Sequence, residues 1–136
     1  MCRGWKRVLA DVSWISSIAA SISGTVRRNG VPVPYARVNV SGPTRVSLQA
    51  DDEGRYRFVT VKPGAYPWKN HHNAWRPAHI HLSLFGPSFL TRLITQMYFP
   101  GDPLIPLDPI LNSVPDMAAR ARMVSSFDLE TTEPEW

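Results

Sequence analysis

The chain has 136 residues, a single cysteine, 43% hydrophobic and 19% charged residues, and a formal net charge of +4. This length and apolar content predict one globular domain and exclude a disordered chain. One cysteine excludes an intrachain disulfide and a thiolate metal cluster, which favours a reducing cytoplasm. The basic residues are scattered rather than clustered, so a nucleic-acid partner is not expected.

Residues 1–20 show no clear hydrophobic period. We interpret them as a poorly defined N-terminal lead before a single domain over residues 21–136. A signal peptide is not favoured because Asp11 interrupts the apolar stretch. No apolar run reaches the roughly 18 residues that a membrane-spanning helix needs. We therefore expect a cytoplasmic protein without a membrane partner.

From Ser21 onward, short stretches of β-branched and aromatic residues alternate with turn residues, which predicts an antiparallel β-sandwich with long loops. The predicted strands are 22–26, 38–40, 56–61 and 79–85. Turn residues fill 28–30, 41–43, 51–54 and 62–64. The 13 prolines oppose long helices because proline lacks the backbone donor that a helix requires.

The C-terminal third contains the one helix that the sequence predicts. The proline-dense segment 98–110 is expected to be an ordered loop. Residues 114–126 are expected to form a short helix, with Asn112 or Ser113 as its cap and Pro115 and Asp116 in its first turn. The predicted fold class is therefore mainly β, with one short helix near the C-terminus.

Two histidines separated by one residue are the strongest functional signal. On a strand, His79 and His81 point to the same face, whereas Ile80 points to the opposite one. Tyr66, earlier in the chain, adds a phenolate oxygen, and this donor set suits ferric iron or zinc. From the residues alone, a strand that binds no metal is equally compatible with the pattern.

Longer motifs surround these histidines, and together they resemble a known family. They are Asp-Glu-Gly-Arg-Tyr-Arg-Phe at 52–58, Val-Lys-Pro-Gly-Ala-Tyr-Pro-Trp at 61–68 and Trp-Arg-Pro-Ala-His-Ile-His at 75–81. With segments 93–102, 109–111 and 127–136, they resemble the intradiol ring-cleavage dioxygenases, and most of all the beta-subunit branch of the protocatechuate-cleaving enzymes. The resemblance implies a non-haem Fe(III) enzyme of aromatic catabolism. Such an enzyme cleaves a catechol-type ring, here most plainly protocatechuate, with O2 to a cis,cis-muconate.

The resemblance also assigns roles to individual residues. It implies that Tyr66, His79 and His81 are metal ligands and that Arg76 is an active-site arginine that stabilises anionic substrate. It places three further residues in the substrate pocket: Trp68, Gln96 and Ile110. A structural role stays open for each: a surface or sheet-edge ion pair for the arginine, core packing for Trp68 and Ile110, and backbone bonds for Gln96. Trp75, Tyr98, His71 and His72 are interpreted as structural.

In one respect the chain departs from the family. A second tyrosine ligand lies in an excursion after the strand corresponding to 38–40, where this chain has only 41–50. Tyr56 is not counted as its replacement because it lies on the next predicted strand. With one phenolate the preference for ferric iron weakens, so zinc or ferrous iron becomes competitive.

The resemblance further implies that the family has a sandwich strand after the position of Trp136. Without it, a free sheet edge would favour association, either with an alpha-type subunit in a hetero-oligomer or in a homo-oligomer. Two other interpretations stay open. One is a catalytically impaired β-sandwich subunit with a structural role, and the other is a zinc site for hydrolysis, although no carboxylate stands beside the histidines as a base.

Overall fold

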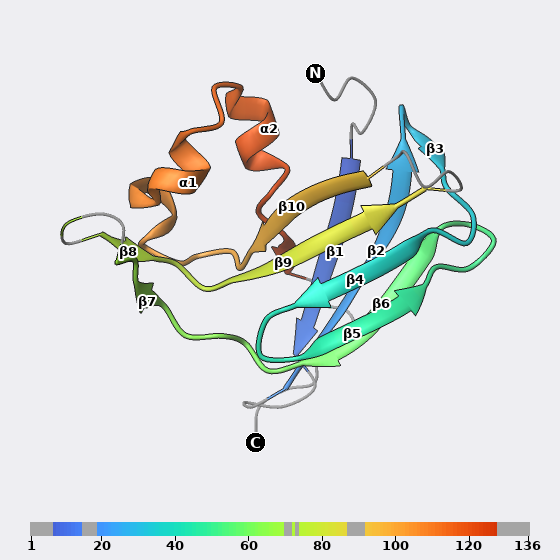
Figure 1. The fold of residues 1–136 in the computed structure, drawn as a ribbon, viewed down its shortest axis with the longest axis horizontal. Helices are drawn as coiled ribbons and strands as arrows, with labels where there is room; N and C mark the ends of the chain where they lie inside the picture. The colour runs from blue at the N-terminus through green and yellow to red at the C-terminus, as the bar shows by residue number, and fades with distance from the viewer. Residues whose placement is uncertain (1–6, 15–18, 70–71, 73, 87–91, 128–136) are drawn as a thin grey trace.

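The computed structural model of the chain describes residues 7–14, 19–69, 72, 74–86 and 92–127. Two β-sheets form the layers of the molecule (Figure 1). One sheet has the order β10 (Arg92–Tyr98), β9 (His79–Phe85), β4 (Arg37–Ser41) and β5 (Arg45–Gln49), and all of its pairings are antiparallel.

The other sheet is centred on β2 (Ala20–Arg28). On one edge, β2 pairs antiparallel with β1 (Arg7–Trp14), which in turn pairs parallel with β11 (Ser126–Phe127). On the other edge it pairs antiparallel with β6 (Arg55–Thr60) and β3 (Val31–Pro32). A separate ribbon of β7 (Tyr66–Pro67) and β8 (Trp75–Arg76) extends from one end.

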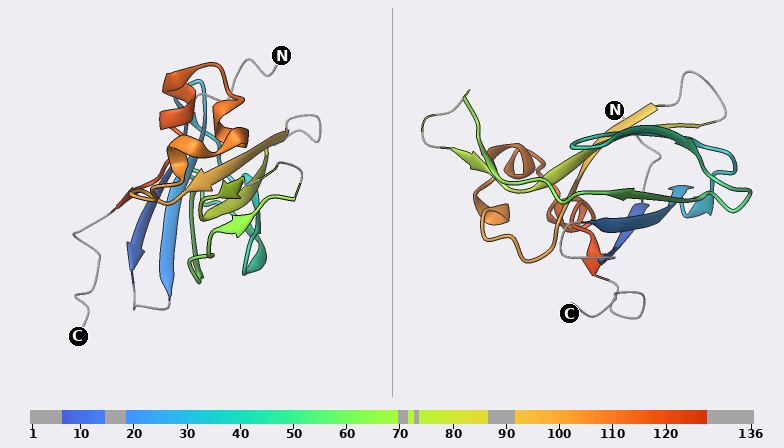
Figure 2. Two further views of the ribbon diagram at one scale, coloured as in Figure 1. Left: turned by 90° about the vertical axis from the view of Figure 1, so that its left-hand side faces the viewer. Right: turned by 90° about the horizontal axis from the view of Figure 1, so that it is seen from below.

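A common apolar core joins the two sheets. Alternate residues of each central strand point inward, as the burial patterns of β4, β6 and β9 show. Ile22 and Phe58 come from one sheet, and Val38, Leu82 and Leu84 from the other. The two layers are seen edge-on in Figure 2. The predicted antiparallel β-sandwich is confirmed.

The predicted strands agree with β2, β4, β6 and β9, and the last of these agrees to the residue. The predicted turn at 28–30 is also confirmed. Asn29 and Gly30 have φ values of 52° and 86°, which suit the tight turn that joins β2 to β3. The structure adds strands that the sequence pattern did not indicate, among them β5 and β10.

Residues 7–14, which lie inside the predicted N-terminal lead, form β1 in this structure. Every residue of β1 pairs with β2, from Arg7 with Arg27 to Trp14 with Ala20. The domain boundary at residue 20 stays a prediction.

The helix prediction was wrong in extent and in number. Two short helices form: α1 (Pro109–Asn112) and α2 (Met117–Ala121), after a 3-10 turn over Ile105–Leu107. Asp116, rather than Asn112 or Ser113, caps α2, because its side chain accepts from the backbone N–H of Ala118 at 2.8 Å. The first helix was missed because its prolines resemble those of a loop, although proline suits a first helical turn.

No helix in the described part of the chain is long and apolar enough to cross a membrane. The helices gather at the end of the molecule where β8 lies (Figure 1). The candidate site is built at this end.

Candidate metal centre

The two faces of β9 divide its residues as the sequence predicted. Ile80, Leu82 and Leu84 are buried in the core, whereas His79 and His81 share the outer face. Their ring centroids lie 5.1 Å apart. His79 is buried with 6% of its surface exposed, and His81 is exposed. The pair therefore offers one enclosed and one open imidazole.

The hydrogen bonds of His79 fix its tautomer. Its Nδ1 lies 2.8 Å from the carbonyl oxygen of Pro77. A carbonyl can only accept, so Nδ1 carries the hydrogen and Nε2 keeps its lone pair. A backbone carbonyl in this position is the usual partner of a histidine that binds metal through its other nitrogen.

Both histidines favour the neutral form that metal binding requires. Burial lowers the pKa of His79, and the charge of Arg76 lowers it further, against an opposing effect of the Pro77 hydrogen bond. Burial and then the charge of Arg76 also lower the pKa of His81. Neutral imidazoles therefore persist at pH values below the ordinary range of histidine.

The ribbon of β7 and β8 brings Tyr66 and Arg76 to the histidines. The two residues are paired across the ribbon, and they meet His79 from the same side. The Tyr66 hydroxyl lies 3.5 Å from Nε2 of His79, and their ring centroids are 5.6 Å apart. Tyr66 is 41% exposed, so its phenol faces both the histidine and solvent.

Arg76 is buried, with 3% of its surface exposed, and it lies at the centre of the cluster. Its Nη1 donates to Nε2 of His79 at 3.0 Å and to the Tyr66 hydroxyl at 3.4 Å. Its Nη2 donates to Oε1 of Gln96 and, at 3.0 Å, to the hydroxyl of Tyr98. Arg76 does form an ion pair, as the alternative interpretation held, but the pair is buried and faces the site rather than lying at the surface or a sheet edge.

Asp108 is the buried counter-ion of Arg76, and sequence reasoning did not identify it. Its oxygens accept from Nε at 3.0 Å and from Nη2 at 2.9 Å, and the residue has no exposed surface. Burial alone would raise the pKa of Asp108, but hydrogen bonds from Arg76, Tyr98 and Ile110 outweigh it and lower the pKa. Conversely, the hydrogen bonds to Asp108 and Tyr66 outweigh burial and raise the pKa of Arg76.

Tyr98 was interpreted as structural, yet it adjoins the site. It pairs with His79 in the register of β9 and β10, and their rings lie 5.7 Å apart. Its hydroxyl donates to Asp108 at 2.7 Å. Burial first, and then the bond to Asp108, raise the pKa of Tyr98, so this phenol stays protonated.

The three predicted pocket residues lie on different segments. Gln96 contacts Arg76 directly and pairs with His81 in the sheet register. Trp68 is half-buried in the loop beyond β7, with its backbone N–H bonded to Ala74. Ile110 is half-buried in α1, two residues after Asp108, and its backbone N–H donates to that carboxylate at 3.2 Å. The contact of all three with a substrate stays a prediction.

The structure thus brings together the imidazoles of His79 and His81, 5.1 Å apart, and the Tyr66 hydroxyl, 3.5 Å from Nε2 of His79. This donor set fits a transition-metal ion that accepts mixed imidazole and phenolate ligands. Among the described residues, no group of three or more His, Cys, Asp or Glu could hold a metal. The role of Tyr66 as a third ligand beside the two histidines stays a prediction.

A second tyrosine does not approach this position from the β4–β5 hairpin. Ser41 pairs with Arg45, so the hairpin turns within three residues that contain no tyrosine. Tyr56 is buried in the core on β6, as expected for a residue that is not a ligand. His72 lies in an exposed turn, and His71 lies outside the described residues.

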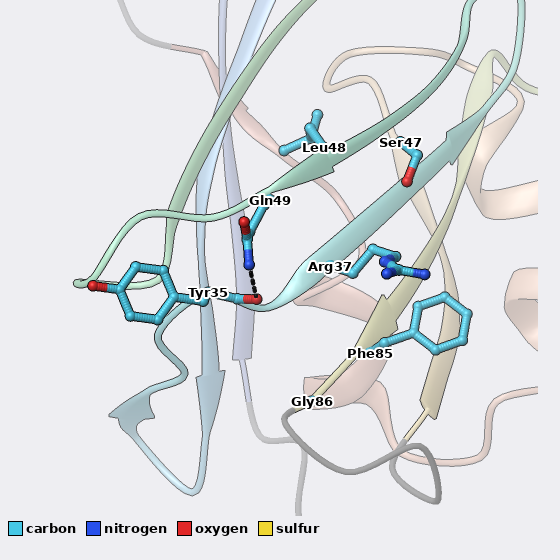
Figure 3. A pocket seen from close by; sticks show the side chains of 7 residues that line it. All are labelled: Tyr35, Arg37, Ser47, Leu48, Gln49, Phe85 and Gly86. Atoms are coloured by element: carbon cyan, nitrogen blue, oxygen red, sulfur yellow. Dashed lines mark hydrogen bonds between the residues drawn. The ribbon is translucent and has the colours of Figure 1, made fainter.

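One cavity in the described part lies away from this cluster. It measures about 460 Å³, and Figure 3 shows Arg37 and Phe85 on its lining, with the amide of Gln49 bonded to the Tyr35 carbonyl. Phe85 ends β9, whereas His79 begins it, so roughly 20 Å of strand separates the two places. We assign the chemistry to the histidine end because the titratable groups converge there.

Comparison with known proteins shows the family of the chain. The family model described as Dioxygenase (Dioxygenase_C) matches residues 25–136. A protein named protocatechuate 3,4-dioxygenase beta chain, from Burkholderia cepacia, is 68% identical over 83 residues. The aligned part is 61% of this chain and 35% of that relative, so the chain spans about a third of the relative's length.

Proposed function

Because the chain belongs to the Dioxygenase family of intradiol ring-cleavage enzymes, we propose that it carries the metal and substrate site of such an enzyme. The reaction would be cleavage of a catechol-type ring by O2 to a cis,cis-muconate. Protocatechuate is the proposed substrate because the B. cepacia relative is named for it.

One observation carries the proposal. The His79 lone pair, the Tyr66 hydroxyl and the Arg76 guanidinium meet at one point, with 3.0 to 3.5 Å between the atoms involved. A buried arginine–carboxylate pair costs desolvation energy and is often no more stabilising than apolar residues of similar size, which favours a role for Arg76 beyond stability. The arginine is suited to an anionic ligand, and a catecholate is one.

Tyr66, His79 and His81 would hold a non-haem Fe(III), with zinc or ferrous iron as competitors because only one phenolate is present. When bound, the metal supplies Lewis acidity that draws electron density from the catechol. The chain itself contributes the fixed charge of Arg76, which stabilises the negative charge on the substrate oxygens. Gln96 and Tyr98 help to hold that arginine in place.

The surroundings of the cluster suit an aromatic ring. Trp68 follows β7 and Ile110 lies in α1, so apolar side chains lie on segments that flank the polar cluster. We propose these two residues, with Gln96, as the substrate contacts. Apolar side chains with a few polar groups are typical of the linings of small-molecule sites.

We propose that the chain acts in a hetero-oligomer, because the B. cepacia relative is named a beta chain. The partner would be an alpha-type subunit, and a homo-oligomer is the alternative. The cytoplasm is the proposed compartment, since a single cysteine suits a reducing environment.

The non-enzymatic alternative is a β-sandwich subunit with impaired catalysis and a structural role. It is favoured by the short β4–β5 hairpin, which provides no second tyrosine ligand. Zinc-dependent hydrolysis is less well supported, because the one carboxylate of the cluster, Asp108, is engaged by Arg76 and lacks the freedom of a general base.

The purified chain loaded with iron provides the test. A tyrosinate-to-iron absorption band in the visible range and O2 uptake that depends on protocatechuate are expected. Absence of both from the iron-loaded chain would remove the enzyme hypothesis. Metal analysis of the protein as purified separates iron, zinc and no metal as outcomes.

A further inference from the structure

The guanidinium of Arg76 has five N–H hydrogens, and acceptors surround all of them. Nε donates to one oxygen of Asp108, and one hydrogen of Nη2 donates to the other. The second hydrogen of Nη2 faces Tyr98 and Gln96. The two hydrogens of Nη1 are left for the metal-ligand candidates His79 and Tyr66.

The Arg76 guanidinium therefore contacts Asp108 with one edge and the candidate metal ligands with Nη1. The carboxylate of Asp108 grips the edge formed by Nε and Nη2, and a two-point contact of this kind fixes the plane of the guanidinium. Once this plane is fixed, the direction of Nη1 is fixed as well. Nη1 points at Nε2 of His79, 3.0 Å away.

Asp108 is held as firmly as the arginine. The hydroxyl of Tyr98 donates to it at 2.7 Å, and the backbone N–H of Ile110 donates at 3.2 Å. This second bond also makes Asp108 the N-cap of α1. Its side chain has no exposed surface, so water cannot replace Arg76 as its partner at low cost.

We propose that Asp108 is a positioning residue that aims Nη1 of Arg76 at the anionic oxygen of a bound catecholate. This inference rests on the proposed function and deepens it. When the Nε2 lone pair of His79 is engaged elsewhere, Nη1 loses that acceptor, and its N–H is free to donate to the ligand. Asp108 keeps this donor in the site, whereas without it the arginine could turn toward solvent.

A purely structural role for Asp108, as helix cap and buried ion pair, predicts a different outcome. Such a role would change the free energy of unfolding and leave the chemistry of the folded molecules intact. Asp108→Asn separates the two, because asparagine is also a good N-cap and has nearly the same size but carries no charge. Asp116→Asn is the matched control, since Asp116 caps α2 in the same way and is exposed.

The first measurement needs neither metal nor turnover. A protected Arg76 Nε–H signal is expected in the proton–nitrogen NMR spectrum of the full chain, assigned by its loss in Arg76→Lys. It should disappear or exchange much faster in Asp108→Asn and persist in Asp116→Asn. If the signal is unchanged in Asp108→Asn, the guanidinium does not depend on Asp108 and the proposal is wrong.

The second measurement is steady-state turnover of protocatechuate by the iron-loaded chain, normalised to folded protein. In Asp108→Asn we expect kcat to fall by about a hundredfold, as for loss of an oriented donor, with KM changed by less than about threefold. Asp116→Asn should retain both constants. An unchanged kcat in Asp108→Asn would overturn the proposal, even if the variant were less stable.

Two further outcomes are informative. If Asp108→Asn does not fold, Tyr98→Phe serves instead, because it removes the hydroxyl that contacts both Asp108 and Arg76 but keeps the ring. A lower kcat at similar KM then supports the proposal, and an unchanged kcat contradicts it. If the wild-type chain shows no O2 uptake, the proposed function fails, and the NMR signal alone decides whether Asp108 positions Arg76.

Discussion

Ser41, at the end of β4, lies directly opposite His81 in the register of β4 and β9. Side chains of directly paired residues share one face of a sheet, so Ser41 lies beside the exposed imidazole of the candidate metal centre. The hairpin to β5 begins immediately after this residue. The segment that would carry a second tyrosine in the wider family is thus replaced here by a short turn beside His81.

We predict that Ser41→Tyr adds a phenolate to the metal site. Paired residues have Cβ atoms about 5 Å apart, so a tyrosine at this exposed position reaches the space in front of His81. A second phenolate favours the ferric ion. Titration with Fe(III) should show tighter binding and a stronger visible charge-transfer band than in the wild-type chain.

Arg37→Tyr is the control for this gain. Arg37 is exposed on the same face of β4 but lies opposite Phe85, four residues from Ser41 or roughly 13 Å along the strand. It adds the same phenol without bringing it to the histidines. Equal iron binding by both variants would show that the added tyrosine acts without coordinating at this site.

The alternating side-chain directions along β9 were predictable because they depend on that strand alone. The period of two along the strand places both histidines on one face whatever the partner strands are. The strand 79–85 and the inward direction of Ile80 followed in the same way. The Asn-Gly pair likewise predicted the turn at Asn29 and Gly30, because these residues tolerate the positive φ that it requires.

The partner of Arg76 was not predictable from the same reasoning. Asp108 stands 32 residues further along the chain, before a proline that begins a four-residue helix. An Asp-Pro pair does indicate a helix start, and that signal was available. Which arginine the capping carboxylate meets depends on how the helical segment packs against β8, and no local pattern encodes this.

Replacement of the two histidines should separate metal binding from stability. Loss of His81 should abolish metal binding but change the free energy of unfolding by less than about 0.5 kcal/mol, because the side chain is exposed. His79→Ala should abolish metal binding and also cost about 1–3 kcal/mol, since it leaves the Pro77 carbonyl and one N–H of Arg76 Nη1 without a buried partner.

Urea unfolding of the metal-free variants measures the stability effect, and metal titration measures the binding. A stability loss in His79→Ala is expected whether the chain is an enzyme or a structural subunit, so it cannot test the non-enzymatic alternative. Only metal binding and turnover discriminate between them. Full metal binding by both variants would mean that the metal is held elsewhere.

Gly54 is predicted to be intolerant of any side chain. Its φ is +74°, and a Cβ built there would lie 2.8 Å from the backbone oxygen of Val26. Gly54→Ala should therefore cost at least about 1–2 kcal/mol from the backbone conformation, and more from the clash. Gly64→Ala is the matched control, because a Cβ there meets no atom within 4 Å. Equal midpoints of urea unfolding for both variants would contradict this account of the β5–β6 turn.

The stability of the metal-free chain should fall as pH decreases below about 7. The pKa values of His79 and His81 are lowered from 6.5 by burial and by Arg76, so the unfolded chain binds more protons than the folded one in this range. Their contribution is complete above the unfolded pKa and is lost as pH falls toward the lower folded pKa. The double variant His79→Gln/His81→Gln should flatten this part of the curve of unfolding free energy against pH. A slope between pH 7 and 5 as steep as that of the wild-type chain would show that groups other than these two histidines dominate the response in this pH range.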